Sequence, residues 1–215
     1  MNLLDLLSDP NERAAQAGRL GGVVIGIVTN NQDPDGLGRV KVKFPWLSDA
    51  DESTWARVAV LMAGKERGTY FLPEVEDEVL VAFEHGDLRF PYVIGSLWNG
   101  KDTPPAKNDD GKNNIRLIKS RSGHVIRLND EDGKEKIEIV DKSGKNSLTF
   151  DTASNTLTIK ADKDIILSAA NGTIKLDAQK VELKSSADAK IEAGAGMDVK
   201  ASGQMTIKGA TVNIN

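Results

Sequence analysis

Five carboxylates lie close together in the sequence and are the side chains best suited to acid–base chemistry. They are Glu74, Glu76, Asp77, Glu78 and Glu84. Two such groups with different pKa values can act as general acid and general base. Here, however, they alternate with apolar residues beside turn signals, which is typical of the solvated face of a β-strand. We therefore predict that they form a structural surface.

The other chemically competent residues lack the neighbours that a site needs. His85 has no serine or cysteine nucleophile beside it, and residues 130–133 (DEDG) lack the ligand ladder and final Glu of a calcium loop. The absence of cysteine excludes thiolate metal sites, thiol nucleophiles and disulfides. The sequence contains no common hydrolase, phosphate-loop, dinucleotide or zinc-protease motif. It thus predicts no catalytic residue, no cofactor and no metal site.

The elements that carry these residues are strands, and the last third of the chain indicates this most clearly. From residue 146 onward an apolar-x-apolar triplet returns every seven to nine residues. In a strand, the two apolar residues share one face and the residue between them faces the other way. The residues expected in the core are Leu157, Ile159, Ile165, Leu167, Ile174, Leu176, Val181, Leu183, Ile191, Val199 and Ile207.

The short period limits how these strands can pack. One strand per eight residues offers only two apolar side chains, so three identical chains wound about one axis would bury them best. Each strand edge would then pair with a neighbouring chain. At about 4.8 Å per stacked strand, the triplets make a rod of roughly 40 Å. We predict an intertwined triple-stranded β-helix in a homotrimer; a single-chain solenoid or an irregular sandwich is the alternative.

The first half of the chain predicts a small barrel. Short apolar stretches with turn signals between them suit a five-stranded OB fold. They span residues 23–30, 39–44, 55–61, 78–83 and 92–98. Lys41 and Lys43 alternate with apolar residues and so face outward. A nucleic-acid groove is one interpretation, but the acidic surroundings favour a solvated or partner-facing strand.

The chain as a whole is expected to be all-β. The polar, proline-bearing residues 100–114 mark a boundary. Beyond it, the doublets Ile115/Leu117, Ile126/Leu128, Ile137/Ile139 and Leu148/Phe150 recur every eleven residues and predict a wider start to the helix. The expected parts are an N-terminal tail or short helix (1–22), an OB-fold domain (23–99), a linker (100–114), a wide β-helical collar (115–147) and a trimeric β-helix needle (148–215).

Charge and hydropathy restrict partners and location. The formal net charge is −4, which argues against nucleic-acid binding. The first residues have no basic n-region, and no apolar run approaches membrane-spanning length. We expect a protein that is made in the cytoplasm without a signal peptide and is carried elsewhere by an assembly.

Four motifs in one order resemble the OB domain of the central spike proteins of contractile injection systems. They are GRVKVKFPW (38–46), WARVA (55–59), PEVEDEVLVAFEHGD (73–87) and PYVIGSLWN (91–99). This family includes phage baseplate assembly protein V, the T4-type tail spike and the VgrG proteins of type VI secretion. Its members carry a β-helical needle after the barrel, as the repeats here predict. The resemblance covers all but the N-terminal tail.

The resemblance implies a structural, membrane-puncturing spike in a phage tail baseplate or a tail-like injection particle. The implied partners are two further copies, baseplate hub and tube proteins, a PAAR-type tip protein and the target cell envelope. The linker has no room for the lysozyme domain of the T4-type spike, and 22 residues cannot hold the additional domains of large VgrG proteins. A terminal His-x-His metal site is also missing, so the expected cap contacts are Thr211, Val212, Asn213, Ile214 and Asn215.

Two other functions stay open. An OB module that binds an oligosaccharide or a nucleic acid, with the repeats as a trimeric fibre stalk, is the main alternative. Salt-dependent nucleic-acid affinity would favour it, whereas co-purification with tail-tube or sheath proteins would favour the spike. A lytic enzyme is the third possibility, and the missing domain argues against it.

Overall fold

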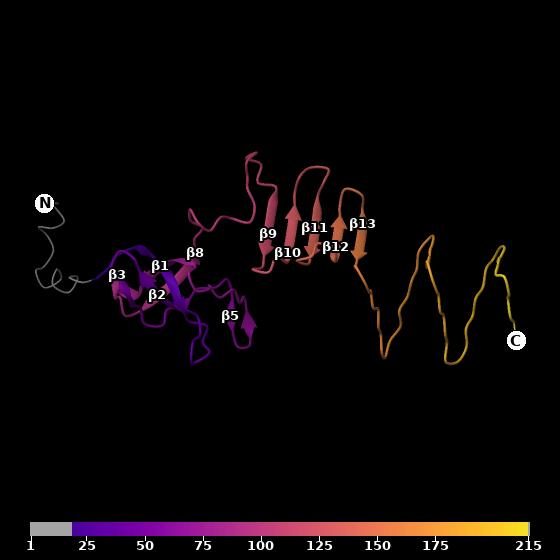
Figure 1. Ribbon diagram of the computed structural model, residues 1–215, viewed down its shortest axis with the longest axis horizontal. Coiled ribbons are helices and arrows are strands. Elements are labelled where there is room, and N and C mark those ends of the chain that lie inside the picture. Colours follow the sequence, from indigo (N-terminus) through magenta and orange to yellow (C-terminus); the bar gives the residue numbers. More distant parts are fainter. Residues whose placement is uncertain (1–18, 215) are drawn as a thin grey trace, which may run out of the picture. The chain divides into compact units, whose positions relative to one another are not determined.

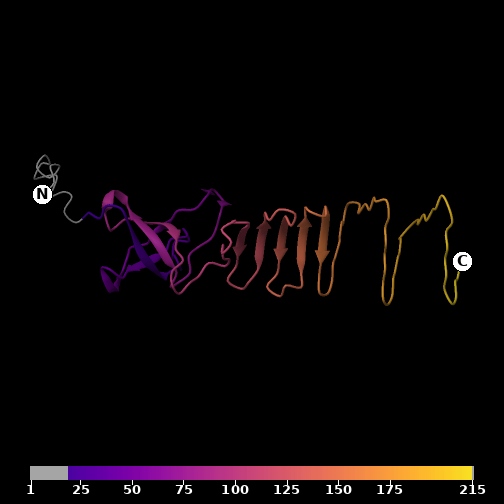
Figure 2. The ribbon, with the colours of Figure 1, turned by 90° about the horizontal axis from the view of Figure 1, so that it is seen from above.

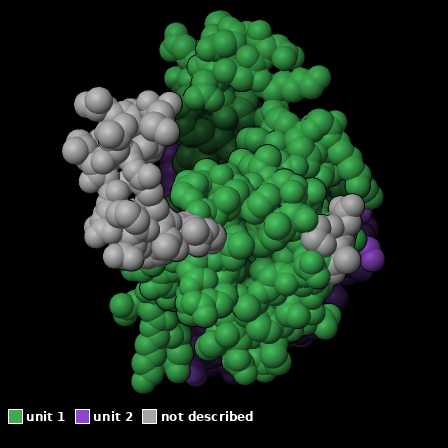
Figure 3. Space-filling model, turned by 90° about the vertical axis from the view of Figure 1, so that its left-hand side faces the viewer, with its two compact units in different colours: residues 1–160 green, residues 161–215 purple. Residues whose placement is uncertain are grey.

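The computed structural model describes residues 19–214 and divides the chain into two compact units, residues 1–160 and 161–215 (Figure 3). The predicted N-terminal tail or helix therefore lies almost wholly outside the described residues, of which Arg19 is the first. Apart from one 3-10 turn, η1 (Glu84–Gly86), the regular structure of the described part is β-strand, so the all-β prediction is confirmed there (Figure 1).

The first sheet has the order β3-β2-β1-β7-β8-β4. Its strands are β1 (Val23–Asn30), β2 (Lys41–Phe44), β3 (Ser48–Glu52), β4 (Arg57–Val58), β7 (Glu78–Phe83) and β8 (Pro91–Ser96). Only the β4–β8 pair is parallel. A bridge between Val40 and Ala56, with N···O distances of 3.0 and 2.7 Å, joins the approach to β2 with the approach to β4. The sheet thus curls into a partly open barrel, consistent with the predicted OB fold.

Alternating side chains of these strands fill the barrel. The buried residues are Val28, Val40, Val42, Phe44, Ala56, Val79, Val81, Phe83 and Val93. Gly26 faces the same core: a Cβ there would lie 3.3–3.4 Å from Val81, Phe44 and Val42. Leu20 packs against this core, and its N–H donates to the Gly86 carbonyl at 2.9 Å. The barrel therefore has an apolar core within a single chain.

The turn before β2 is fixed by one carboxylate. Asp33 accepts hydrogen bonds from the backbone N–H groups of Asp35, Leu37 and Arg39 at 3.1–3.2 Å. The Arg39 guanidinium adds two more, at 2.8 and 2.6 Å, and holds the pKa of Asp33 far below its usual value. The turn expected at residues 33–38 is thus confirmed, with Gly36 and Gly38 at positive φ.

Two expectations for the barrel strands are wrong. The stretch 55–61 forms a strand only at β4, because the chain then leaves the barrel for a small hairpin of β5 (Ala63–Gly64) and β6 (Arg67–Gly68). Conversely, the acidic segment 48–52 is a strand that was not expected. It pairs with β2 in the register Lys43 to Glu52, and the Lys41 Nζ lies 3.1 Å from a Glu52 carboxylate oxygen.

A second sheet follows the linker. It is an antiparallel meander of β9 (Ile115–Lys119), β10 (Val125–Asn129), β11 (Lys136–Val140), β12 (Ser147–Asp151) and β13 (Thr156–Lys160) (Figures 1 and 2). Residues 148 and 150 thus share one sheet with the eleven-residue repeats before them. The strands predicted around the doublets are confirmed as far as Lys160.

The register corrects the first doublet. Ile126 of β10 lies opposite Ile118 of β9, and Leu128 lies opposite Arg116. Ile115 and Leu117 therefore face the other side of the sheet from the Ile126/Leu128 doublet. The turn at 120–124 decides this, because a shift of one residue moves every side chain of a strand to the opposite face.

The second unit, by itself, changes direction at bends that recur about every eight residues (Figures 1 and 2), and these bends include residues 171–172, 194–195 and 202–203. Asn-Gly, Gly-Ala and Ser-Gly occupy these positions, as expected for turns. Between 161 and 214 no strand is assigned to the extended legs. A strand requires a hydrogen-bonding neighbour, and these legs find none among residues 19–214.

Candidate assembly interface

One face of the second sheet is apolar. Ile126 lies opposite Ile139, Leu148 opposite Ile159, and Phe150 opposite Leu157. Such cross-strand neighbours pack together on one side of a sheet. The exposed members of this apolar face are Ile118, Ile126, Leu128, Ile137, Ile139, Phe150, Leu157 and Ile159, each between 40% and 57% accessible. Nothing in the described chain covers them fully.

On the opposite face, the middle of strands β10 to β13 is polar and internally paired. Arg127 lies 3.4 Å from Glu138, and Lys136 lies 3.2 Å from Asp151. Thr149 and Thr158 face each other across the next strand pair. A sheet with one apolar and one polar face normally covers the apolar side with protein and leaves the polar side in water.

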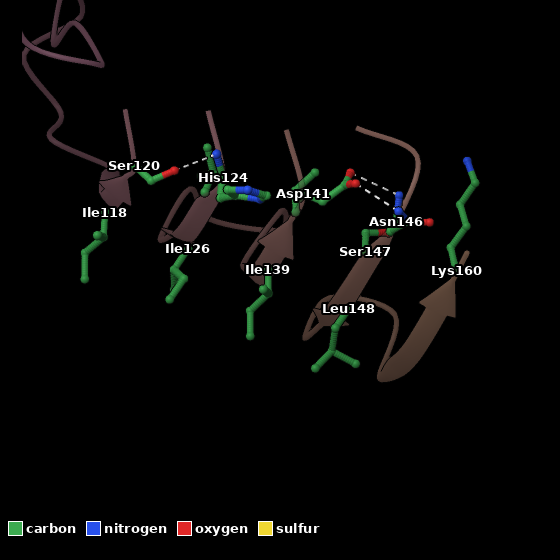
Figure 4. Close-up of a pocket in the computed structure, with 12 residues that line it drawn as sticks. Ile118, Ser120, His124, Ile126, Ile139, Asp141, Asn146, Ser147, Leu148 and Lys160 are labelled. Carbon is green, nitrogen blue, oxygen red and sulfur yellow. Dashed lines mark hydrogen bonds between the residues drawn. The ribbon is translucent and has the colours of Figure 1, made fainter. Parts of the chain in front are cut away.

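Figure 4 shows how the apolar face is built at one end of the strands. Ile118, Ile126, Ile139 and Leu148 point to the same side, from four successive strands. They border a hollow of about 530 Å³ that also touches His124, Asp141, Asn146 and Lys160. The hollow is a shallow part of the apolar face, lined mainly by hydrocarbon.

The turns at this end are held by short-range hydrogen bonds. The Ser120 hydroxyl accepts from the His124 backbone N–H at 3.0 Å, and the His124 Nδ1 accepts from the Lys142 N–H at 3.2 Å. Asp141 accepts from the Ser143 hydroxyl and the Asn146 amide, at 2.7 and 2.8 Å. These bonds, that of Ser143 first, lower the pKa of Asp141 to about 2. The His124 side chain thus stabilises a turn.

In the second unit all nine residues predicted for the core are exposed. Ile165, Leu167, Ile174, Leu176, Val181, Leu183, Ile191, Val199 and Ile207 are each between 51% and 83% accessible. Leu157 and Ile159, the other two predicted core residues, lie on the apolar face of the sheet. Of the predicted cap contacts, Thr211, Val212, Asn213 and Ile214 are exposed, and Asn215 lies outside the described residues.

The carboxylates first considered for catalysis are held by separate partners. Glu74 pairs with Arg121 at 2.9 Å, Glu78 accepts from Asn99 at 3.2 Å, and Glu84 accepts from the Tyr92 hydroxyl at 2.6 Å. Asp77 caps its own turn through the Glu74 N–H at 2.8 Å, and Glu76 has a positive φ of 77°.

Potential metal ligands are equally dispersed. Among residues 19–214 no three His, Asp or Glu side chains come together as a metal group. Residues 130–133 form the tight turn that was expected there, closed by the Lys134 N–H on the Glu131 carbonyl at 2.8 Å, with Gly133 at φ 72°.

The sequence reasoning missed one exposed apolar segment. Around the β5–β6 hairpin, Leu61 is 97% accessible, and Met62, Tyr70 and Phe71 are also exposed. The sequence signal that could have revealed this segment is the loss of apolar–polar alternation after Val60, where several apolar residues follow one another. No helix among the described residues is long and apolar enough to cross a membrane.

Comparison with known proteins confirms the resemblance to central spike proteins. Residues 24–98 match the family model of the type VI secretion system/phage-baseplate injector OB domain. The type VI secretion system spike protein VgrG1a of Pseudomonas aeruginosa is 30% identical over 143 residues, which is 61% of this chain and 22% of that protein. Spike protein VgrG3 of Vibrio cholerae is 34% identical over 48% of this chain and 11% of its own length.

The curated relatives are much longer than the part that they share with this chain. The actin cross-linking toxin VgrG1 of Vibrio cholerae is 33% identical over 111 residues, which are 48% of this chain and 10% of the toxin. The aligned part thus spans at most about a fifth of the relatives described here, and the activity in that last name belongs to a far larger protein.

Proposed function

We propose that this chain is the structural, membrane-puncturing central spike of a contractile injection machine. The single observation that carries the proposal is the apolar face of the second sheet, whose doublets recur through residues 161–214 and are exposed in the single chain. Burying one Leu or Ile side chain fully contributes about 1.5–3 kcal/mol. A row of such side chains therefore favours a permanent protein partner over water.

The proposed partner is two further copies of the chain. Three sheets that turn their apolar faces to one axis would bury the doublets in a narrow core. The legs of the second unit would gain the strand neighbours that they lack, each pairing with another chain, which yields the intertwined triple-stranded β-helix. A closed prism leaves few free strand edges and resists unfolding kinetically, as a puncturing rod requires.

The OB barrel would attach this rod to the rest of the machine. In the proposed machine it contacts the baseplate hub and tube proteins, and contraction of the sheath drives the needle into the target envelope. The protein would act within a phage tail baseplate or an extracellular or cytoplasmic injection particle. The exposed Val212 and Ile214 would meet a PAAR-type tip protein that extends the strands.

The main rival is an OB module that binds oligosaccharide or nucleic acid on a trimeric stalk. The outward Lys41 pairs with Glu52, and its Nζ lies 5.6 Å from the centre of the Trp55 ring. A lysine engaged in this way is a poor contact for phosphate, whereas a nucleic-acid groove needs a free basic stripe. This observation favours the structural role.

The test is the mass of the purified chain in solution, followed by pull-down. Light scattering should give three times 23.2 kDa, and the trimer should retain tail-tube or sheath proteins from source cells. A folded monomer with the same β content would refute the trimer. Salt-sensitive retention of nucleic acid, with no tube or sheath protein, would favour the rival.

A further inference from the structure

The two ends of the strands in the second sheet carry opposite charge. In an antiparallel meander, the turns 120–124 and 141–146 and the last residues of β9 and β13 lie at one end. This basic end carries Lys119, Arg121, Lys142, Lys145 and Lys160 against the single acid Asp141. Arg121 pairs with Glu74, but Lys119, Lys142 and Lys160 form no ion pair within the described residues.

The other end of the same strands is acidic. It comprises residues 130–136 and 151–155, with Asp130, Glu131, Asp132, Glu135 and Asp151 against Lys134 and Lys136. Three of the acids are already paired within the chain: Asp130 with Arg116, Glu131 with Lys134 and Asp151 with Lys136. Asp132 and Glu135 form no ion pair within residues 19–214.

The apolar face shows the direction in which copies must meet. It is two residues wide along each strand, about 7 Å, and five strands long, about 19 Å. A narrow stripe is best covered by copies that share an axis parallel to it. The strands then lie across that axis, and their two ends become the corners at which neighbouring copies touch.

We infer that the basic end of one copy docks against the acidic end of the next, around a closed ring of three. The inference rests on the proposed trimer and specifies how its copies join. In a three-fold ring every contact is heterologous, so each copy offers one end to one neighbour and the other end to the second neighbour. Charge complementarity then acts at all three corners.

The same charges disfavour one competing assembly. A two-fold pair that stacks apolar faces with its equivalent strands parallel places basic end over basic end and acidic end over acidic end. Like charges in contact raise the free energy of a wrong arrangement and so select the right one. The strand ends thus oppose that pair and favour the heterologous contacts of the ring, while the apolar face supplies most of its stability.

Charge reversal of the full chain tests this docking. K119E/K142E reverses two lysines of the basic end, and D132K/E135K reverses two acids of the acidic end. Each exposed ion pair changes an equilibrium by about twofold to fivefold, and each occurs at three corners. We expect either double variant to weaken trimer assembly about hundredfold, and the quadruple variant to regain most of it.

A linker variant, K101E/K107E, makes the same change in net charge as K119E/K142E, away from the strand ends, and should assemble as the wild type. The readout is trimer fraction against protein concentration by sedimentation, at low and high salt. If the wild type is a trimer and the end variants match the linker variant, the docking is wrong while the trimer stands. If the quadruple variant stays as weak as the doubles, the ends do not face one another. A monomeric wild type overturns both proposals.

Discussion

A single aspartate on the apolar face should disrupt assembly, although half of that position is already in water. Ile159 of β13 is 57% accessible in the chain. A single-chain view therefore predicts little effect from I159D, since exposed substitutions usually change stability by under about 0.5 kcal/mol. If the chain forms the trimer, the same substitution should destabilise the assembly far more, because the side chain would be buried there.

The expected cost follows from the exposed fraction. If the trimer buries the remaining 57% of Ile159, each chain gains about 1–2 kcal/mol from that side chain, or roughly 3–5 kcal/mol for the three copies. Three carboxylates near one axis add desolvation and mutual repulsion. Assembly of I159D should therefore weaken by at least about a hundredfold.

The matched control is T158D, at the preceding residue of the same strand. Thr158 faces the polar side, opposite Thr149, and is exposed. It adds the same charge without entering the proposed core, so trimer content should match the wild type. Sedimentation over a range of concentrations measures both variants, with circular dichroism to confirm β content. Equal loss in I159D and T158D would refute the assignment of the apolar face.

Four further outcomes are expected. I191D should prevent assembly of the second unit or lower its thermal stability sharply, whereas K190D should change stability by under about 0.5 kcal/mol; heat denaturation compares them. G26V should destabilise the barrel by about 1–3 kcal/mol in chemical denaturation, because the new side chain meets Val81, Phe44 and Val42. The folded pKa of Asp141 lies below its ordinary value, at about 2 against 3.8, so its stabilising contribution is full above about pH 4 and is lost between pH 4 and 2. The gap in melting temperature between wild type and D141N should close over that window. V212D/I214D should weaken binding of a PAAR-type cap about tenfold or more in pull-down while leaving the trimer intact.

Much of the barrel could be predicted because the local sequence pattern is enough to identify its strands. Alternating Val, Ile and Phe at 23–30 and 78–83 indicate both the strands and their inward faces. The Asp33-Pro-Asp-Gly turn carries its own hydrogen-bonding groups, so it also could be read without tertiary context. The apolar triplets near residues 126, 137, 148 and 157 indicate their strands equally clearly.

The misses depend on partners that lie elsewhere in the chain. Residues 48–52 have poor strand propensity and pair only because β2 offers a free edge and Lys41 a counter-charge for Glu52. The parity of Ile115 and Leu117 depends on the length of the turn at 120–124, since a period-two pattern tolerates either face until a register is set. Apolar spacing alone cannot supply that register.

The two kinds of core imply an order of folding. The barrel buries Val28, Val42, Val79 and Val81 completely inside one chain, so it can fold as soon as that chain is made. The apolar doublets of β10–β13 and of residues 161–214 are exposed in the single chain, and in the proposed trimer they are buried only by other copies. Barrel folding should therefore be independent of protein concentration, whereas needle formation should accelerate with it. Until partners arrive, the apolar face and the unpaired legs are exposed, and docking of a basic strand end against an acidic one would give each arriving copy a defined orientation.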